Sequence, residues 1–341
     1  MPLSKIQTAE MLDTPNLGRR NLIINGDMRI AQRGTSFASS ADAAYLLDRF
    51  KIYTVNSGDE TVSQSTDVPT GEGFIYSLKL DVTGADTSIA AGDYLTIDQI
   101  IEGQNLTHLH WGTSNAKSIT VSFWVKSTLT GTYCYSVRNN AIDRSYVEDF
   151  DVNAANTWEK KTFTIQGDTT GTWLTTNGVG QIHQISTMMG STYIGSAGWQ
   201  SGNAVSTNNQ VNLMNSTANE LYITGWQVEV GNTATPFEHR LYSEELRNCQ
   251  RYYVDLERVF IFGTGYQSNV GGNGVGSPVL FPSTMRDVPD VTTGTQTDGG
   301  SNSEMVFNQI RKTGMQVEAQ VTSGGNANVY VYADVACNAE L

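Results

Sequence analysis

Apolar residues change their spacing once along this chain, between Glu220 and Tyr253. Over residues 221–230, β-branched and aromatic side chains recur as in a strand, and Gly231–Asn232 ends the run. Beyond Pro236 the apolar residues follow helical spacing instead. These residues are Tyr242, Leu246, Cys249 and Tyr253. The pattern predicts a strand that closes one β domain and a short helix that leads into the next.

The charges around this predicted helix suit its dipole. Ser243 is the expected N-cap, Glu244 and Glu245 lie in the first turn, and Arg247 and Arg251 lie later. A helix of about ten to twelve residues is only marginally stable by itself. We therefore expect its apolar seam to pack on its own β domain or on copies of itself around a symmetry axis.

The rest of the chain has the composition of a β protein. It has 341 residues, 33 of them glycine, and only 16% are charged, a profile that suits β-sandwiches with many polar turns. Strand-like runs recur between Gly-, Asn- and Thr-rich turns, without the regularly placed helices of a parallel α/β sheet. We predict an all-β chain with four parts: an N-terminal arm (1–20), a jelly-roll β-sandwich (21–240), a linker helix (241–253) and a smaller C-terminal β-sandwich (254–341).

Individual runs give more detailed expectations. Residues 21–37 predict a hairpin around an Asn25–Gly26 turn. Residues 74–84 and 118–128 alternate between apolar and polar positions, and Trp124 falls on the polar side. Only residues 95–103 are expected to contain a helical turn.

The N-terminus and the overall charge narrow the classes of function. Residues 3–12 fit a short capped helix, and the chain has neither a membrane-length apolar run nor the apolar core of a signal peptide, so we expect a soluble chain that is not exported. Cys134, Cys249 and Cys337 are too far apart for a disulfide framework or a zinc site, which fits a reducing cytoplasm. A net charge of −13 disfavours nucleic-acid binding.

Several segments resemble a tail-fibre or tail-tip family of tailed bacteriophages, of the kind common in marine and cyanobacterial phages. They are residues 21–37, 111–133, 157–165 and 226–253, with further likeness at 3–11, at 281–291 and at the closing Ala339–Leu341. The resemblance implies a trimeric virion protein of the tail, assembled in the host cytoplasm. It also implies a first sandwich similar to family 4/9 carbohydrate-binding modules. We expect the arm, 1–20, to attach to other tail proteins.

Motifs for enzyme chemistry are absent. The sequence has no G-x-S-x-G elbow, P-loop or HExxH. Carboxylate pairs such as Asp143 with Glu148, or Glu159 with Asp168, arise by chance in a chain with 34 acidic residues.

Two metal sites were considered. His108 and His110 would share one side of a strand and could bind a metal, although a surface pair is the commoner case. Asn25, Asp27 and Asp48 could supply oxygens to a structural calcium ion. No other cofactor is expected.

Aromatic residues on polar surfaces are the best candidates for sugar binding. A pyranose buries its C–H face on a flat ring while neighbouring polar groups bind its hydroxyls. The candidates are Trp124, Trp173, Trp199, Tyr135 and Arg138, whereas Trp158 and Trp226 are expected in the core. Each candidate aromatic could equally be a core residue, as large aromatic side chains usually are.

The predicted function is therefore that of a tail-fibre or tail-tip adhesin that binds a host surface glycan and has no enzymatic activity. A polysaccharide depolymerase, or a carbohydrate-binding accessory to one, is the alternative. Neither nucleic acid nor membrane insertion is expected. The oligomer contact is expected at Tyr242, Leu246, Cys249 and Tyr253.

Overall fold

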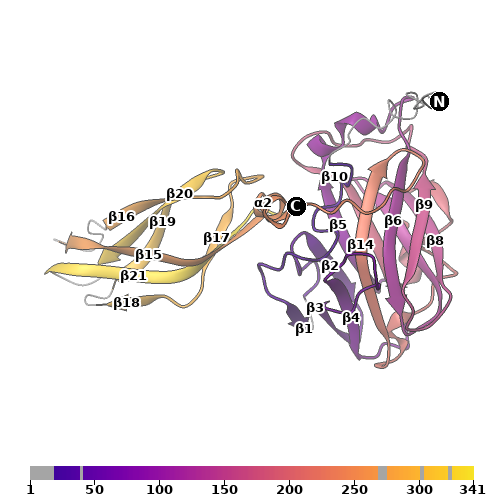
Figure 1. The fold of residues 1–341 in the computed structure, drawn as a ribbon, viewed down its shortest axis with the longest axis horizontal. Helices are drawn as coiled ribbons and strands as arrows, with labels where there is room; N and C mark the ends of the chain where they lie inside the picture. Colours follow the sequence, from indigo (N-terminus) through magenta and orange to yellow (C-terminus); the bar gives the residue numbers. More distant parts are fainter. Residues whose placement is uncertain (1–18, 39–40, 268–274, 300–302, 322–324) are drawn as a thin grey trace, which may run out of the picture. The chain divides into compact units, whose positions relative to one another are not determined.

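The computed structural model describes residues 19–38, 41–267, 275–299, 303–321 and 325–341 (Figure 1). The chain divides into two compact units, Met1–Arg240 and Leu241–Leu341. Strands make up nearly all of the regular structure, and α2 (Tyr242–Gln250) is the single α-helix among the residues just named. The all-β prediction is therefore confirmed. The helix predicted at 3–12, and most of the predicted arm, lie outside the described residues. No helix in the described part is long and apolar enough to span a membrane.

The first unit is a β-sandwich of the jelly-roll type with two six-stranded antiparallel sheets (Figure 1). Sheet A has the order β1 (Ser36–Ala38), β3 (Asp59–Ser65), β4 (Ser77–Gly84), β14 (Glu220–Val230), β6 (Ile119–Ser127) and β9 (Glu159–Ile165). Sheet B has the order β12 (Gly198–Ser201), β8 (Arg144–Val152), β7 (Gly131–Arg138), β10 (Val179–Met189), β5 (Tyr94–Glu102) and β2 (Phe50–Val55). A parallel pair, β11 (Ile194–Gly195) and β13 (Ser206–Thr207), follows in the segment around β12.

Alternate residues of the strands fill the space between the sheets. Phe123 of β6, Tyr135 of β7 and Trp226 of β14 are fully buried, and the ring centroids of Tyr135 and Trp226 are 5.7 Å apart. The predicted inward face of β4 is also found, because Leu78 and Leu80 are fully buried. Burial of each such side chain contributes about 1.5–3 kcal/mol. These buried side chains therefore hold the two sheets together.

The predicted hairpin at residues 21–37 is wrong, because no strand is present between residues 19 and 35. This segment pairs with β14 instead: Leu22 N donates to Val228 O (2.8 Å) and Trp226 N donates to Gly26 O (2.9 Å). A Cβ at Gly26 would lie 2.1 Å from the Trp226 carbonyl oxygen, so only glycine allows this approach. The turn itself exists, and the Asn25 side chain closes it through bonds to the Ile30 backbone.

The helical turn predicted near residues 95–103 is found only at the end of that stretch, because most of these residues form a strand. These residues form β5, which lies between β10 and β2 in sheet B. A short 3-10 turn, η1 (Gly103–Asn105), begins only where the strand ends. The residues between the isoleucines of β5 are polar yet buried. Because of them, the sequence does not show the regular alternation of apolar and polar residues that predicts a strand.

The second unit is a smaller sandwich of two sheets. One sheet contains β15 (Tyr253–Gln267), β21 (Gly325–Asn338) and β17 (Asp290–Thr293), with β18 (Thr297–Gly299) also paired to β21. The other has the order β16 (Val275–Leu280), β20 (Gly314–Val321) and β19 (Ser303–Arg311). Its core includes Val317 and Val331, one from each sheet. Cys134, Cys249 and Cys337 are buried thiols that form no disulfide.

The helix α2 departs from two expectations. Leu241, not Ser243, occupies the N-cap, and no side chain caps the helix. Cys249 is fully buried within the chain, so its side chain is not available to another copy, and this part of the predicted oligomer contact is wrong. Tyr242 is 55% exposed, and Leu246 and Tyr253 are half-buried.

Candidate functional site

Sheet B presents polar side chains on the face turned away from the sandwich core. On β7, Tyr135 points inward while Ser136 and Arg138 point outward, because successive side chains of a strand alternate. The register pairs Ser136 with Gln184 of β10 and Gln184 with Asp98 of β5. Asp98, Gln184 and Ser136 are all buried. A layer of buried polar groups therefore crosses the middle of this face.

Hydrogen bonds link part of this layer. Gln184 Nε2 donates to Asp98 Oδ2 (2.6 Å), and Ser136 Oγ donates to Gln184 Oε1 (3.2 Å). Arg138 Nη1 donates to Asn203 Oδ1. By contrast, Arg138 Nε and Ser186 Oγ are buried without a partner among the described residues. Buried polar groups are nearly always satisfied, so these two atoms have bonding capacity left for a water or another molecule.

Burial dominates the electrostatics of this layer. Burial raises the pKa of Asp98 to about 7, against the opposing effects of the Thr96 hydroxyl, Arg138, Gln184 and Lys51. Burial likewise lowers the pKa of Arg138, and Asp98 partly offsets that effect. A carboxyl group with this pKa changes its charge near neutrality, and it can then either donate or accept a hydrogen bond.

Three half-buried tyrosines surround the polar layer: Tyr53 of β2, Tyr94 of β5 and Tyr193 of the 3-10 turn η3 (Ser191–Tyr193). All three interact electrostatically with Arg138. The rings of Tyr94 and Tyr193 meet edge to face at 5.3 Å. Lys51 Nζ lies 4.7 Å from the centre of the Tyr53 ring. We call this region, Tyr53, Tyr94 and Tyr193 around Asp98, Arg138, Gln184 and Ser186, the tyrosine-rimmed face.

The tyrosine-rimmed face combines the two elements of saccharide recognition. Aromatic rings provide apolar surface, and convergent amide, guanidinium, carboxyl and hydroxyl groups can pair with sugar hydroxyls. Among the predicted sugar-binding residues, the structure places only Arg138 here. The three tyrosines were missed, because their grouping depends on the order of the strands in sheet B, which the sequence does not reveal.

Tyr135 is the clearest correction. It is fully buried on the core side of β7, where its hydroxyl bonds His183 Nδ1 (2.7 Å) and accepts from Trp226 Nε1 (3.2 Å). No sugar can reach it. The predicted strand is present, and Arg138 lies on its outward face as a sugar-binding candidate should, but Tyr135 lies on the opposite, core face.

Trp173 and Trp199 come together with Trp111 in a cluster away from this layer. The three indole rings meet edge to face, with centroids 4.8–5.8 Å apart. Trp173 Nε1 donates to Asp168 Oδ2, and Arg144 donates two hydrogen bonds to the same carboxylate, from Nε and Nη2. The Arg144 guanidinium lies 5.5 Å from the centre of the Trp199 ring. This cluster braces the loop at 166–177, and both Trp173 and Trp199 are half-buried in it.

Trp124 and Trp158 lie on sheet A or beside it. Trp124 is half-buried on the outer side of β6, as the alternation predicted, opposite Lys160 and Thr224. Trp158 is half-exposed, contrary to the expectation of a core position, and its Nε1 donates to Asp67 Oδ1 (3.0 Å). Trp226 is in the core, as expected.

In the structure, residues of the two metal sites that the sequence suggested have other contacts or conformations. His108 belongs to a 3-10 turn, η2 (Thr107–Leu109), and His110 has a left-handed backbone, so the two rings are not paired on a strand. The Asp48 carboxylate accepts from Gln32, and that of Asp27 pairs with Arg29. Within the described ranges, no group of three His, Cys, Asp or Glu residues could hold a metal ion.

The carboxylates considered for catalysis are engaged in hydrogen bonds with other residues. Glu159 pairs with Lys161 and also accepts from Asn153 and Ala154. Although burial opposes these bonds, they lower the Glu159 pKa to about 2. The pKa of Asp168 is also lowered, by Arg144 and Thr170 against burial. Glu148 accepts from the Tyr146 hydroxyl, and Asp143 accepts from Asn139. Glu159 and Asp168 are thus held as anions, which is unsuited to a general acid.

Comparison with known proteins gives only distant likenesses. No known family and no curated protein matches the sequence. Among solved structures, 62% of this chain aligns with 22% of the enzymatically active domain of tailspike protein 4 of bacteriophage CBA120, at 12% identity and a TM-score of 0.33. A CBM4 structure aligns over 61% of this chain and 98% of its own, at 13% identity and a TM-score of 0.31. The family 11 carbohydrate-binding module of a Clostridium thermocellum cellulosomal cellulase aligns over 60% and 98%, at 11% identity and a TM-score of 0.29. Similarity of this degree does not establish a shared activity.

Proposed function

We propose that the first unit binds a saccharide on the tyrosine-rimmed face, and that the chain is a tail-fibre or tail-tip adhesin of a tailed phage that attaches to a host surface glycan. The observation that carries the binding role is the buried, unpartnered Arg138 Nε and Ser186 Oγ on a sheet face where three half-buried tyrosines interact with Arg138. The sequence resemblance supports the virion role. We further propose that the chain is located in the phage tail, that residues 1–20 attach it to other tail proteins, and that it has no enzymatic activity.

Replacing Tyr193 by alanine is expected to weaken glycan binding about 5- to 30-fold, because one ring face contributes about 1–2 kcal/mol. Glycan-array binding followed by titration of the best ligand measures the effect. Trp124→Ala is the matched control, since Trp124 is a half-buried aromatic on the other sheet. Loss of binding by Trp124→Ala, with Tyr193→Ala unchanged, would place the site on sheet A and reject this one.

The alternative, a depolymerase or its accessory, differs in its products. An adhesin leaves the polysaccharide intact, whereas a depolymerase releases reducing ends. Incubation of the purified chain with each glycan that it binds, followed by a reducing-end assay, separates the two. Release of reducing ends that is lost with a single carboxylate substitution would overturn the proposal that the chain has no enzymatic activity.

A homotrimer, as the resemblance implies, needs a contact surface. The strongest candidate in the described residues is an aromatic ladder on the second unit, formed by Phe260 and Phe262 of β15 with Tyr332 and Tyr330 of β21. Phe260 and Phe262 are 55% and 61% exposed, and their ring planes differ by 5°. A contiguous exposed apolar patch marks an interaction site. We propose that a second copy covers it.

The double variant Phe260→Asp, Phe262→Asp is therefore expected to convert a trimer to monomers, because two charges would be buried at the contact. Light scattering coupled to gel filtration measures the mass. Leu280→Asp is the control, since Leu280 is 79% exposed on the other sheet of the same unit. A wild-type chain that is monomeric at micromolar concentration would show that the ladder is not covered by another copy.

A further inference from the structure

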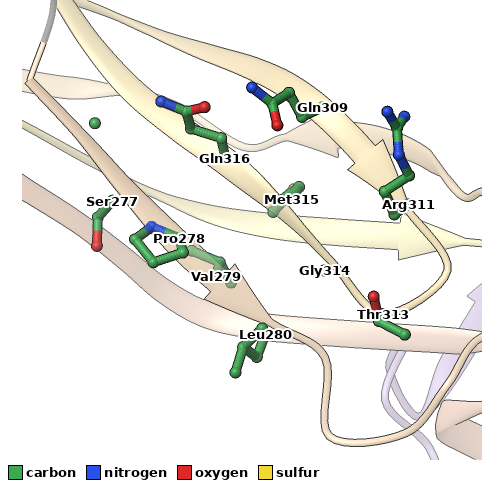
Figure 2. Close-up of a pocket in the computed structure, with 11 residues that line it drawn as sticks. Ser277, Pro278, Val279, Leu280, Gln309, Arg311, Thr313, Gly314, Met315 and Gln316 are labelled. Atoms are coloured by element: carbon green, nitrogen blue, oxygen red, sulfur yellow. The ribbon is translucent and has the colours of Figure 1, made fainter.

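The second unit carries a hollow on the sheet formed by β16, β20 and β19 (Figure 2). Its volume is 390 Å³, within the range of small-ligand sites. Figure 2 shows the side chains of Gln309 on β19, Gln316 on β20 and Arg311 at the end of β19, with Pro278 and Leu280 on β16. The hollow thus combines two amides, a guanidinium group and an apolar wall.

Gln309 is in a backbone conformation that costs energy. The pairing of β19 with β20 shifts register between Asn308 and Arg311, and Gln309 at this bulge has a φ of +50°. A non-glycine residue in the left-handed region costs roughly 1–2 kcal/mol. The Gln309 side chain lines the hollow and is exposed. Bulges often turn a side chain toward a functional site.

The Gln309 side chain makes no hydrogen bond to the described residues. No such bond therefore offsets the energetic cost of its backbone conformation. Glycine would adopt the same backbone without strain. Strained residues of this kind cluster at binding and catalytic sites. The position therefore points to a use of the glutamine amide outside the chain.

The neighbouring polar groups have unused capacity as well. Arg311 Nη1 donates to the carbonyl of Ile310 (3.2 Å), which leaves its Nε and Nη2 for other acceptors. Gln316 Nε2 donates to Glu318 Oε1 (3.0 Å), which leaves its amide oxygen as an acceptor. Leu280 is 79% exposed beside them. A guanidinium group pairs with a carboxylate or phosphate through two parallel bonds, and amides bind hydroxyls.

We propose that this hollow binds an anionic pyranose, with the acidic group on Arg311, ring hydroxyls on Gln309 and Gln316, and the C–H face on Pro278 and Leu280. The site belongs to the second unit and is separate from the tyrosine-rimmed face. The anionic group could be the carboxylate of a uronic acid or the phosphate of a phosphorylated sugar, and the test distinguishes them.

The test is titration of the isotope-labelled full chain with glucuronate, glucose 6-phosphate and glucose, followed by NMR of the side-chain amides and Arg Nε. We expect at least one anionic sugar to shift Gln309, Gln316 and Arg311, with an affinity at least about ten times that for glucose, a difference of about 1.4 kcal/mol. The anion that binds more tightly identifies the acidic group. Equal binding of glucose, or no shift at millimolar concentrations of any probe, would overturn the proposal.

Variants separate binding from folding. Gln309→Gly removes the amide and relieves the strain, so we expect a melting temperature at or above that of the wild type and about ten-fold weaker binding. Arg311→Ala should lose the preference for the anion. Gln320→Ala on β20 should bind the anionic sugar like the wild type. The shifts of Gln309 and Gln316 report the hollow alone, which keeps this site distinguishable from the proposed glycan site. Unchanged affinity in Gln309→Gly, or a lower melting temperature, would assign Gln309 to the fold and reject the site.

Discussion

Replacing Trp226 by alanine is expected to lower the free energy of unfolding of the first unit by about 3–5 kcal/mol. Trp226 is fully buried on β14, and its ring lies 5.8 Å from that of Phe50 and 6.3 Å from that of Phe123. The substitution leaves a cavity between the sheets. It also removes the indole N–H that donates a hydrogen bond to the Tyr135 hydroxyl. The loss is a large fraction of the 5–15 kcal/mol that stabilises a typical domain.

Urea unfolding followed by far-UV circular dichroism measures this loss, since tryptophan fluorescence itself changes with the substitution. Trp124→Ala removes the same side chain from a half-buried position on the outer face of sheet A, and we expect it to cost no more than about 1 kcal/mol. Equal losses from the two variants would contradict the assignment of Trp226 to the core.

Alternation within single strands made the fold class predictable. In β4 and β6, apolar residues occupy every second position, and the structure buries Leu78, Leu80, Val121 and Phe123 as expected. The sequence failed where tertiary contacts decide the conformation. Residues 21–30 read as a hairpin, but they pair with β14, which lies about 200 residues further along the chain.

The candidate site was less predictable than the fold. Arg138 was identified, yet Tyr135, three residues away in the same strand, was placed on the wrong face. A single strand shows which residues share a face but does not show which face meets the core. The tyrosine-rimmed face adds a second difficulty, because it joins β2, β5, β7, β10 and η3, whose adjacency is a property of the whole sheet.

Buried polar residues escaped the sequence pattern for the same reason. His183 of β10 is fully buried and lies on the core side of the strand, as Ile185 does. It lies in a chain of bonds from Trp226 Nε1 to the Tyr135 hydroxyl and on to His183 Nδ1. His183 Nε2 bonds Gln181 Oε1 (2.9 Å), so the network assigns its proton to Nε2 and leaves Nδ1 as the acceptor.

His183 and Asp98 are expected to affect stability in opposite ways as pH changes. Burial lowers the His183 pKa from 6.5 to about 3, so its contribution is fully present above pH 6.5 and is lost as pH falls toward 3. Burial raises the Asp98 pKa from 3.8 to about 7, so its contribution is fully present below pH 3.8 and is lost as pH rises toward 7. Each changes the free energy of unfolding by about 1.4 kcal/mol per pH unit, with opposite signs, between about pH 4 and 6.5.

Single variants should uncover these two opposed slopes. Relative to the wild type, His183→Gln should make stability fall more steeply with rising pH, by about 1.4 kcal/mol per unit between pH 4 and 6. Asp98→Asn should change the slope by the same amount in the other direction, and the double variant should regain the wild-type slope. Urea titrations at several pH values give the free energy of unfolding, and its slope against pH is compared between variants. A cost of the substitution that does not depend on pH leaves this slope unchanged. The slope depends on the difference in bound protons between the unfolded and folded states. Because both side chains titrate normally once the chain unfolds, the slope shows how far each pKa is shifted in the fold. Parallel pH profiles for the wild type and His183→Gln would mean that His183 is protonated within the fold, and that the bond to Tyr135 does not depend on a neutral ring.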